Sequence, residues 1–206
     1  MNYSNIEQIY EMVNITFNLY RDYGGSDYIG ENITQLEHAL QCAHQASIDY
    51  PDNNAIILGA FLHDVGHLIS LHDIEHPSNK LLSYNNESLN GLGLINHENV
   101  GANFLDNIGY PKIVGDLGRY HVMAKRYLVT RDSEYLNNLS DASKETFKLQ
   151  GGVLSESELE NFDNNEHKEL FIKMRNWDDR AKDVNFKYEK NINDFENMAL
   201  ALMFGK

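Results

Sequence analysis

The stretch Ile56-Ile57-Leu58-Gly59-Ala60-Phe61-Leu62-His63-Asp64-Val65-Gly66-His67-Leu68-Ile69 places three polar side chains in an otherwise apolar run. Its composition predicts one buried helix, on which His63 and His67 are four residues apart and share a face with Asp64 beside them. A carboxylate inside an apolar helix is costly unless it is paired or bound to a cation. A metal ion is the simplest explanation, and a pair of hydrogen-bonded core histidines is the alternative.

The bulk composition of the 206 residues indicates one globular domain with a sizeable core. The net charge of −14 argues against nucleic-acid binding, which depends on clustered Lys and Arg, but it does not exclude an anionic small substrate. No apolar run approaches the ~20 residues of a membrane span, and we expect neither a signal peptide nor an obligate protein partner. The single cysteine, Cys42, excludes an internal disulfide and favours a cytoplasmic location.

Apolar periodicity predicts an all-α fold. Capping boxes at Thr34 and Ser155 mark two helix starts. We expect helices at about residues 4–22, 34–49, 53–69, 97–107, 111–129, 140–150, 165–184 and 192–204, with a short acidic helix from Ser155 and a connector at 136–139. Residues 70–93 lose the periodicity and are predicted to form a long loop, in which His72 and His76 are better explained as solvated side chains than as ligands.

Histidines and aspartates at helix ends or facing apolar neighbours form a second pattern. His38, the His63-Asp64 pair and Asp178 offer four ligands for one divalent ion, with Asp179 as the alternative to Asp178. Two more histidines, sharing the carboxylate of Asp64, would bind a second ion ~3.5–4 Å away; these are His97 and His121. Imidazole with carboxylate suits Fe, Mn, Zn or Ni, and we expect no soft sulfur ligand that would favour copper(I) or an iron–sulfur cluster.

The order His38…His63-Asp64…His97…His121…Asp178 resembles the HD-domain superfamily of metal-dependent enzymes over about residues 28–183. The resemblance implies a single HD domain over residues 1–206, a helical bundle with a two-metal site in its core and packing helices at both ends. Most of that superfamily are phosphohydrolases, in which a metal-bound hydroxide attacks phosphorus. A smaller branch uses two irons and molecular oxygen, as in myo-inositol oxygenase and the PhnZ-type oxygenases that cleave organophosphonates.

Several segments resemble the PhnZ-type branch more closely. Tyr28-Ile29-Gly30-Glu31 resembles its Tyr-x-x-Glu segment, in which the Glu meets the substrate amino group and the Tyr guards the open iron. His63-Asp64-Val65-Gly66-His67 resembles its His-Asp-x-Gly-His, whose last His binds the phosphonate. The resemblance implies catalytic roles for Tyr28, Glu31 and Asp64, substrate contacts from Tyr28, Glu31, His67, Lys125, Ser143 and Arg175, and metal ligation by His38, His63, Asp64, His97, His121 and Asp178.

The activity implied by this resemblance uses an Fe(II)/Fe(III) pair bridged by Asp64, with O2 as co-substrate. The substrate would be a small zwitterionic organophosphonate, 2-amino-1-hydroxyethylphosphonate, cleaved to glycine and phosphate. Lys125, Arg175 and His67 would form a cationic pocket for the phosphonate, although Lys125 and Arg175 could instead pair with surface carboxylates. A phosphohydrolase acting on a nucleotide or phosphomonoester is the alternative function, and a metal-binding module without turnover is a third.

Overall fold

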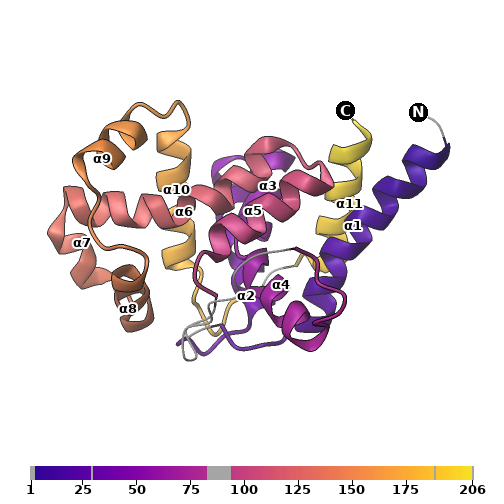
Figure 1. Cartoon of the computed structure of the whole chain (residues 1–206), viewed down its shortest axis with the longest axis horizontal. Coiled ribbons are helices and arrows are strands. Elements are labelled where there is room, and N and C mark those ends of the chain that lie inside the picture. The colour runs from indigo at the N-terminus through magenta and orange to yellow at the C-terminus, as the bar shows by residue number, and fades with distance from the viewer. Residues whose placement is uncertain (1–2, 29, 83–93, 188, 206) are drawn as a thin grey trace.

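The computed structural model describes residues 3–28, 30–82, 94–187 and 189–205, and within these ranges it is built of helices, as predicted (Figure 1). In chain order they are α1 (Tyr3–Tyr23), α2 (Gln35–Asp49), α3 (Asn54–Leu62), α4 (Val65–Glu75), α5 (His97–Ile108), α6 (Lys112–Arg131), α7 (Ser133–Asn138), α8 (Asp141–Leu149), α9 (Glu156–Asp163), α10 (Lys168–Arg180) and α11 (Ile192–Phe204).

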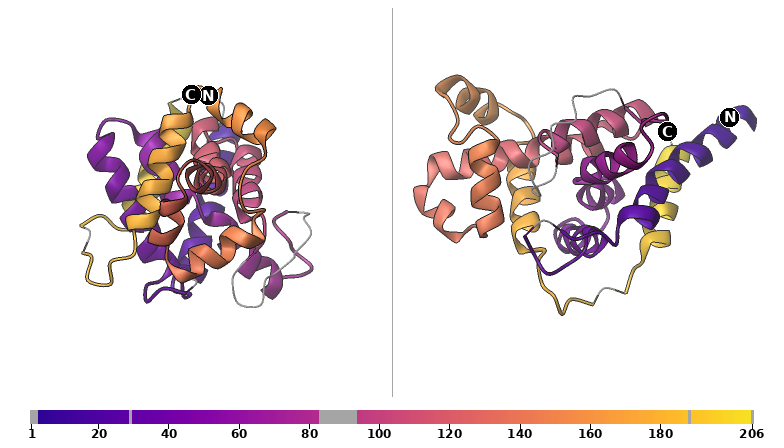
Figure 2. Two further views of the ribbon diagram at one scale, coloured as in Figure 1. Left: turned by 90° about the vertical axis from the view of Figure 1, so that its left-hand side faces the viewer. Right: turned by 60° about the horizontal axis from the view of Figure 1, so that its bottom comes forward.

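Helix α3 is the centre of the core. Its residues 56–62 are all buried, and a helix that is apolar on every side must be surrounded by other helices. It packs against α2 and α6, and α6 in turn packs against α5 and α10. The pair α1 and α11 lies on the side away from α7, α8 and α9 (Figures 1 and 2). The ring of Phe195 stacks on Phe61 at 4.4 Å between centroids, which fixes α11 to the core.

The prediction of one helix over residues 53–69 is wrong. The run is divided into α3 and α4, which meet at His63 and Asp64 with a bend of 45°. Asp64 has ψ 12°, outside the helical range, so His63, at the C-cap of α3, and His67, in α4, do not share a helical face. The bend leaves carbonyl groups without helical partners, and the hydroxyl of Tyr20 donates a hydrogen bond of 2.9 Å to the one on Phe61.

Glycine allows α4 to approach α5 directly after the bend. A Cβ on Gly66 would lie 2.1 Å from the carbonyl oxygen of His97. In the same way, a Cβ on Gly118 of α6 would lie 2.8 Å from the carbonyl oxygen of His63. These two close contacts bring three helices to the same point in the core.

Other boundaries differ from the predicted ones in instructive ways. Helix α4 continues to Glu75, so the loop predicted for residues 70–93 is wrong at its start, and residues 83–93 lie outside the described ones. Helix α7 occupies the predicted connector, because Asp132 caps it by accepting a hydrogen bond from the backbone N–H of Glu134. Both predicted capping boxes, at Thr34 and Ser155, are confirmed.

No single helix in the described part of the chain is long and apolar enough to cross a membrane. The bent pair α3–α4 meets that test by length and composition alone, and α3 lies in the protein core.

Candidate metal centre and adjoining pocket

Six predicted ligands converge at the bend between α3 and α4. We define the first cluster as His38, His63, Asp64 and Asp178, and the second cluster as Asp64, His97 and His121. All six side chains are buried. They come from α2, the α3–α4 junction, α5, α6 and α10, so that five separate parts of the chain meet here.

The first cluster is centred on His38. Its Nε2 atom lies 3.3 Å from Nε2 of His63, 3.4 Å from Oδ1 of Asp178 and 3.6 Å from Oδ2 of Asp64. The Nε2 atom of His63 lies 3.3 Å from the same Oδ2 atom of Asp64. Asp179 instead accepts hydrogen bonds from Arg175 and Tyr135, so the geometry favours Asp178 over Asp179 as a ligand.

The second cluster uses the other oxygen of the same carboxylate. Oδ1 of Asp64 lies 3.3 Å from Nε2 of His97 and 3.6 Å from Nε2 of His121, and the two Nε2 atoms are 3.3 Å apart. Each oxygen of Asp64 therefore faces a different pair of imidazoles. This is the arrangement that a carboxylate bridging two ions requires.

Backbone carbonyls set the tautomer of the four clustered histidines. Because a carbonyl only accepts, each Nδ1 must donate, which leaves each Nε2 as a lone pair directed into a cluster. The four acceptors are Ala181 for His38 (2.9 Å), Ala60 for His63 (2.8 Å), Leu94 for His97 (3.3 Å) and Gly118 for His121 (2.6 Å). Two such Nε2 atoms at 3.3 Å cannot hydrogen-bond to each other, whereas a cation between them would satisfy both.

The Asp64 carboxylate also fits a cation. Although burial acts to raise its pKa, the neighbouring imidazoles of His63, His97 and His121 hold it well below its usual range when they carry protons on Nε2, so it is ionised in the core. A bound cation would take the place of those protons. Its Oδ1 atom is buried and accepts no hydrogen bond from the described residues. An unpartnered buried carboxylate oxygen facing imidazole lone pairs fits a metal centre.

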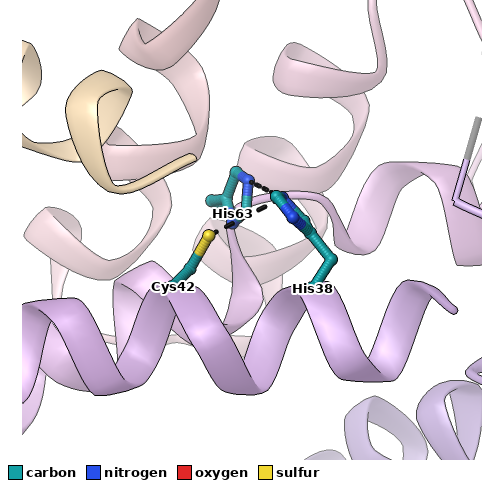
Figure 3. Close-up of side chains that lie close together, drawn as sticks. All are labelled: His38, Cys42 and His63. Carbon is teal, nitrogen blue, oxygen red and sulfur yellow. Dashed lines mark hydrogen bonds between the residues drawn. The ribbon is translucent and has the colours of Figure 1, made fainter. Parts of the chain in front are cut away.

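Cys42 corrects the expectation that no sulfur ligand is near. It lies one turn after His38 on α2, with its Sγ atom 3.6 Å from Nε2 of that histidine. Figure 3 shows the thiol directed toward His38 and His63, and the three donor atoms lie within 4.8 Å of one another. Burial raises the pKa of the Cys42 thiol well above its usual range, so it is neutral in the absence of a cation.

A cavity of about 60 Å³ adjoins the clusters. All three residues of the second cluster line it, whereas of the first cluster only Asp64 and Asp178 do, so the second cluster is the more open to the cavity. All of the predicted substrate contacts line it as well: Tyr28, Glu31, His67, Lys125, Ser143 and Arg175.

Tyr28 covers the first cluster. Its ring stacks on that of His38 at 3.9 Å between centroids, and its hydroxyl donates a hydrogen bond of 3.3 Å to Oδ1 of Asp178. The loop that carries it is closed by an antiparallel bridge between Asp27 and Thr34. Tyr28 therefore covers the His38 side of this cluster, while Asp64 and Asp178 reach the cavity.

The predicted cations differ in how much charge they offer. Lys125 is buried, and burial together with the nearby charge of Arg175 lowers its pKa to about 7. Arg175 donates to Asp178 (2.7 Å), to Asp179 and to the hydroxyl of Tyr135 (3.3 Å), so it is paired with buried and half-buried carboxylates rather than surface ones. Two of its five N–H groups remain for a ligand.

His67 is not a cation in this pocket. Its ring stacks on that of His97 at 3.9 Å between centroids. Burial lowers the pKa of His67 to about 3, so at neutral pH it offers a ligand one N–H group and no charge.

Two polar pocket residues that interact with predicted ones, Thr146 and Lys182, were not predicted from the sequence. Thr146 accepts a hydrogen bond of 3.0 Å from Lys125. It lies three residues after Ser143 on the same helix, and this spacing could have predicted that both side chains face the pocket. Lys182 follows the end of α10, and its Nζ atom lies 3.2 Å from Oε1 of Glu31. No spacing rule connects a residue beyond a helix end with a distant loop.

Comparison with known proteins agrees with this geometry. A model of the HD domain family matches residues 35–144. The chain is 40% identical over 181 residues to the uncharacterized protein L432 of Acanthamoeba polyphaga mimivirus, covering 87% of this chain and 76% of that protein. It is 38% identical over 172 residues to hydroxymethylphosphonate dioxygenase of Gimesia maris, covering 84% and 79% of the two chains.

A further relative comes from Leisingera caerulea and is named [1-hydroxy-2-(trimethylamino)ethyl]phosphonate dioxygenase (glycine-betaine-forming). It is 36% identical over 159 residues, covering 77% of this chain and 74% of that protein. The chain belongs to the HD-domain family. Within that family it is an enzyme of the dioxygenase kind.

Proposed function

We propose that the protein is an iron- and O2-dependent oxygenase that cleaves the carbon–phosphorus bond of a small 1-hydroxyalkylphosphonate. The balanced reaction is R–CH(OH)–PO3H2 + O2 → R–COOH + H3PO4. The carbon is oxidised to a carboxylic acid, O2 is reduced, and phosphorus leaves as phosphate. The two named relatives that are phosphonate dioxygenases support this reaction class for the chain.

The observation that carries the proposal is the difference between the two clusters. The first has four protein ligand groups and is covered by Tyr28, whereas the second has three and lines the cavity. A site with fewer protein ligands keeps open positions for substrate oxygens. Bound irons would supply the activation of O2 and the positive charge that holds the hydroxyl and phosphonate oxygens.

The remaining pocket groups suit a phosphonate placed beside the second cluster. Lys125 offers a point charge, Arg175 its two remaining N–H groups, and His67 and Ser143 neutral hydrogen-bond donors. A cavity of about 60 Å³ has room for a small molecule, since one water needs roughly 10–15 Å³ of such space. This size favours a hydroxyphosphonate over the nucleotide that a phosphohydrolase would bind.

The test is O2 uptake and phosphate release by iron-loaded protein given 1-hydroxyalkylphosphonates. We expect one phosphate for each O2 consumed. The proposal fails if neither is detected. Phosphate release from a nucleotide or phosphomonoester without O2, in the presence of Mn or Mg, would favour the phosphohydrolase instead.

A further inference from the structure

Lys182 places a cation beside Glu31, at the position where the family resemblance implies that a substrate amine would bind. Its Nζ atom lies 3.2 Å from Oε1 of Glu31, 3.3 Å from Oγ of Ser140 and 3.4 Å from Oγ of Ser143. The side chains of Lys182 and Glu31 are only 15% and 19% exposed. This ion pair is therefore largely shielded from water, and its charges act strongly on a bound ligand.

The backbone on both sides of Lys182 is fixed. On one side, the carbonyl of Ala181 accepts the hydrogen bond from Nδ1 of His38. On the other, the backbone N–H of Asp183 donates 2.9 Å to Oε1 of Gln41, and Nε2 of Gln41 donates 3.1 Å to the carbonyl of Asp183. The segment that orients a ligand of the first cluster thus also positions this lysine.

The loop that carries Glu31 is also fixed against the opposite wall. Gly30 has φ +74°, a conformation that favours glycine, and a Cβ there would lie 2.6 Å from Cβ of Ala142 on α8. The next residue of α8 is Ser143, one of the contacts of Lys182. Glu31 and Lys182 are consequently held together by three parts of the chain: Gly30 and Glu31, α8 and the segment after α10.

A substrate with a cationic amine would have to compete with this lysine. It would approach Glu31 only by displacing Lys182, and the displaced ammonium would then lie near a second cation. Oε1 of Glu31 is buried, and its contact with Lys182 is an ion pair at 3.2 Å rather than a well-directed hydrogen bond. The negative charge of Glu31 is therefore already neutralised by Lys182 before a substrate amine enters.

We propose that Lys182 is a specificity residue that takes the place of a substrate ammonium opposite Glu31. The pocket then prefers 1-hydroxyalkylphosphonates without a cationic amine, such as hydroxymethylphosphonate, over their 2-amino and 2-trimethylamino relatives. This inference rests on the proposed function. Overall identity does not distinguish these substrates, because the relatives named for an amine-free and for a trimethylamino substrate match the chain at 38% and 36%.

The experiment compares kcat/KM of the iron-loaded enzyme for three substrates: hydroxymethylphosphonate, 2-amino-1-hydroxyethylphosphonate and [1-hydroxy-2-(trimethylamino)ethyl]phosphonate. We expect the wild-type enzyme to prefer the first at least tenfold. Lys182→Met should shift this preference at least tenfold toward the two amines, mainly through their KM. Adding Glu31→Gln to that variant should abolish the shift, because the shift requires the freed carboxylate.

Two controls keep the result interpretable. Lys144→Met removes a half-exposed lysine of α8 that pairs with Asp141 and does not line the pocket, and it should leave the preference unchanged. Lys182→Gln retains a hydrogen-bond donor toward Ser140 and Ser143, and it replaces Lys182→Met if that variant does not fold.

Each other outcome overturns the proposal. If the wild-type enzyme prefers an amine, Glu31 binds the substrate and Lys182 does not replace it. If loss of Lys182 lowers kcat/KM equally for all three substrates, the lysine contacts the phosphonate. Both results leave the proposed function intact, whereas the absence of turnover with all three substrates overturns the proposed function and this inference with it.

Discussion

The ligand cage and the outer wall of the pocket are built in different ways. The cage consists of the six residues of the two clusters, all buried on or beside core helices, and four backbone carbonyls orient its imidazoles. The outer wall consists of Tyr28, Glu31, Ser143, Thr146 and Lys182, which come from a loop, α8 and the segment after α10. The cage has little freedom to vary, whereas the wall can change its charges without disturbing the core.

The strongest test of this contrast removes the bridge of the cage. Asp64→Ala should lower the metal content from two ions per chain to less than one and reduce turnover by roughly a thousandfold or more, because both clusters share this carboxylate. Metal analysis and O2 uptake measure the two effects. The matched control is Asp116→Ala, which should retain both ions. Asp116 is a buried aspartate too, but it lies in α6 and pairs with Lys112. Two ions per chain in Asp64→Ala would contradict the bridging role.

The second test concerns Lys125, a buried pocket residue outside both sets that donates a hydrogen bond to Thr146 of the wall. The pKa of Lys125 is lowered from 10.5 to about 7, so the unfolded chain binds more protons than the folded one between these values. Stability of the metal-free protein should therefore rise with pH across this window, by about 5 kcal/mol for this group alone.

Lys125→Met should remove the cost of burying this ammonium group. The variant should therefore be more stable than the wild type below pH 7, and this difference should shrink toward pH 10. Urea denaturation at a series of pH values measures the difference. Lys112→Met, on the same helix but 73% exposed, should give a difference that does not vary with pH. Parallel curves for Lys125→Met and the wild type would refute the lowered pKa.

A third, smaller effect probes how closely the cage helices approach each other. Gly66→Ala places a Cβ 2.1 Å from the carbonyl oxygen of His97, so α4 must move away from α5. We expect a loss of about 2–3 kcal/mol in the free energy of unfolding. Gly25→Ala, where a Cβ would meet nothing within 4 Å, is the control. Equal melting temperatures for the two variants would show that the helices adjust freely.

The smallest effect is expected in the wall. Thr146→Val removes the hydroxyl that accepts the hydrogen bond from Lys125, which should raise KM for the phosphonate about fivefold, equivalent to about 1 kcal/mol. Metal content should not change. Thr146→Ser keeps the hydroxyl and should keep KM near the wild-type value, and an equally raised KM in that variant would contradict the role of the hydroxyl.

The same contrast explains what the sequence could predict. Helices and their caps are local features, and His38, His63 and Asp64 stand out because imidazole and carboxylate are costly in a core. The break at Asp64 was missed, because it depends on Gly66 and Gly118 meeting other helices, and such contacts leave no local pattern.

The chemistry of the wall was harder to predict than that of the cage. The sequence predicts that Glu31 faces the pocket, but its partner Lys182 lies 151 positions away at a segment with no motif. Arg175 was expected to be free for a phosphonate, whereas the structure pairs it with two carboxylates. Which charges neutralise each other is decided by tertiary contacts rather than by residue type.

The bend between α3 and α4 has a consequence for motion. His63 and Asp64 are consecutive, so a single peptide unit links the bridging carboxylate to its nearest imidazole in the first cluster. When helices shift against one another, the ligands from α2, α5, α6 and α10 move relative to the bridge, but these two do not separate. The covalent link thus keeps these two proposed ligands next to each other, whereas the positions of the other four depend on helix packing.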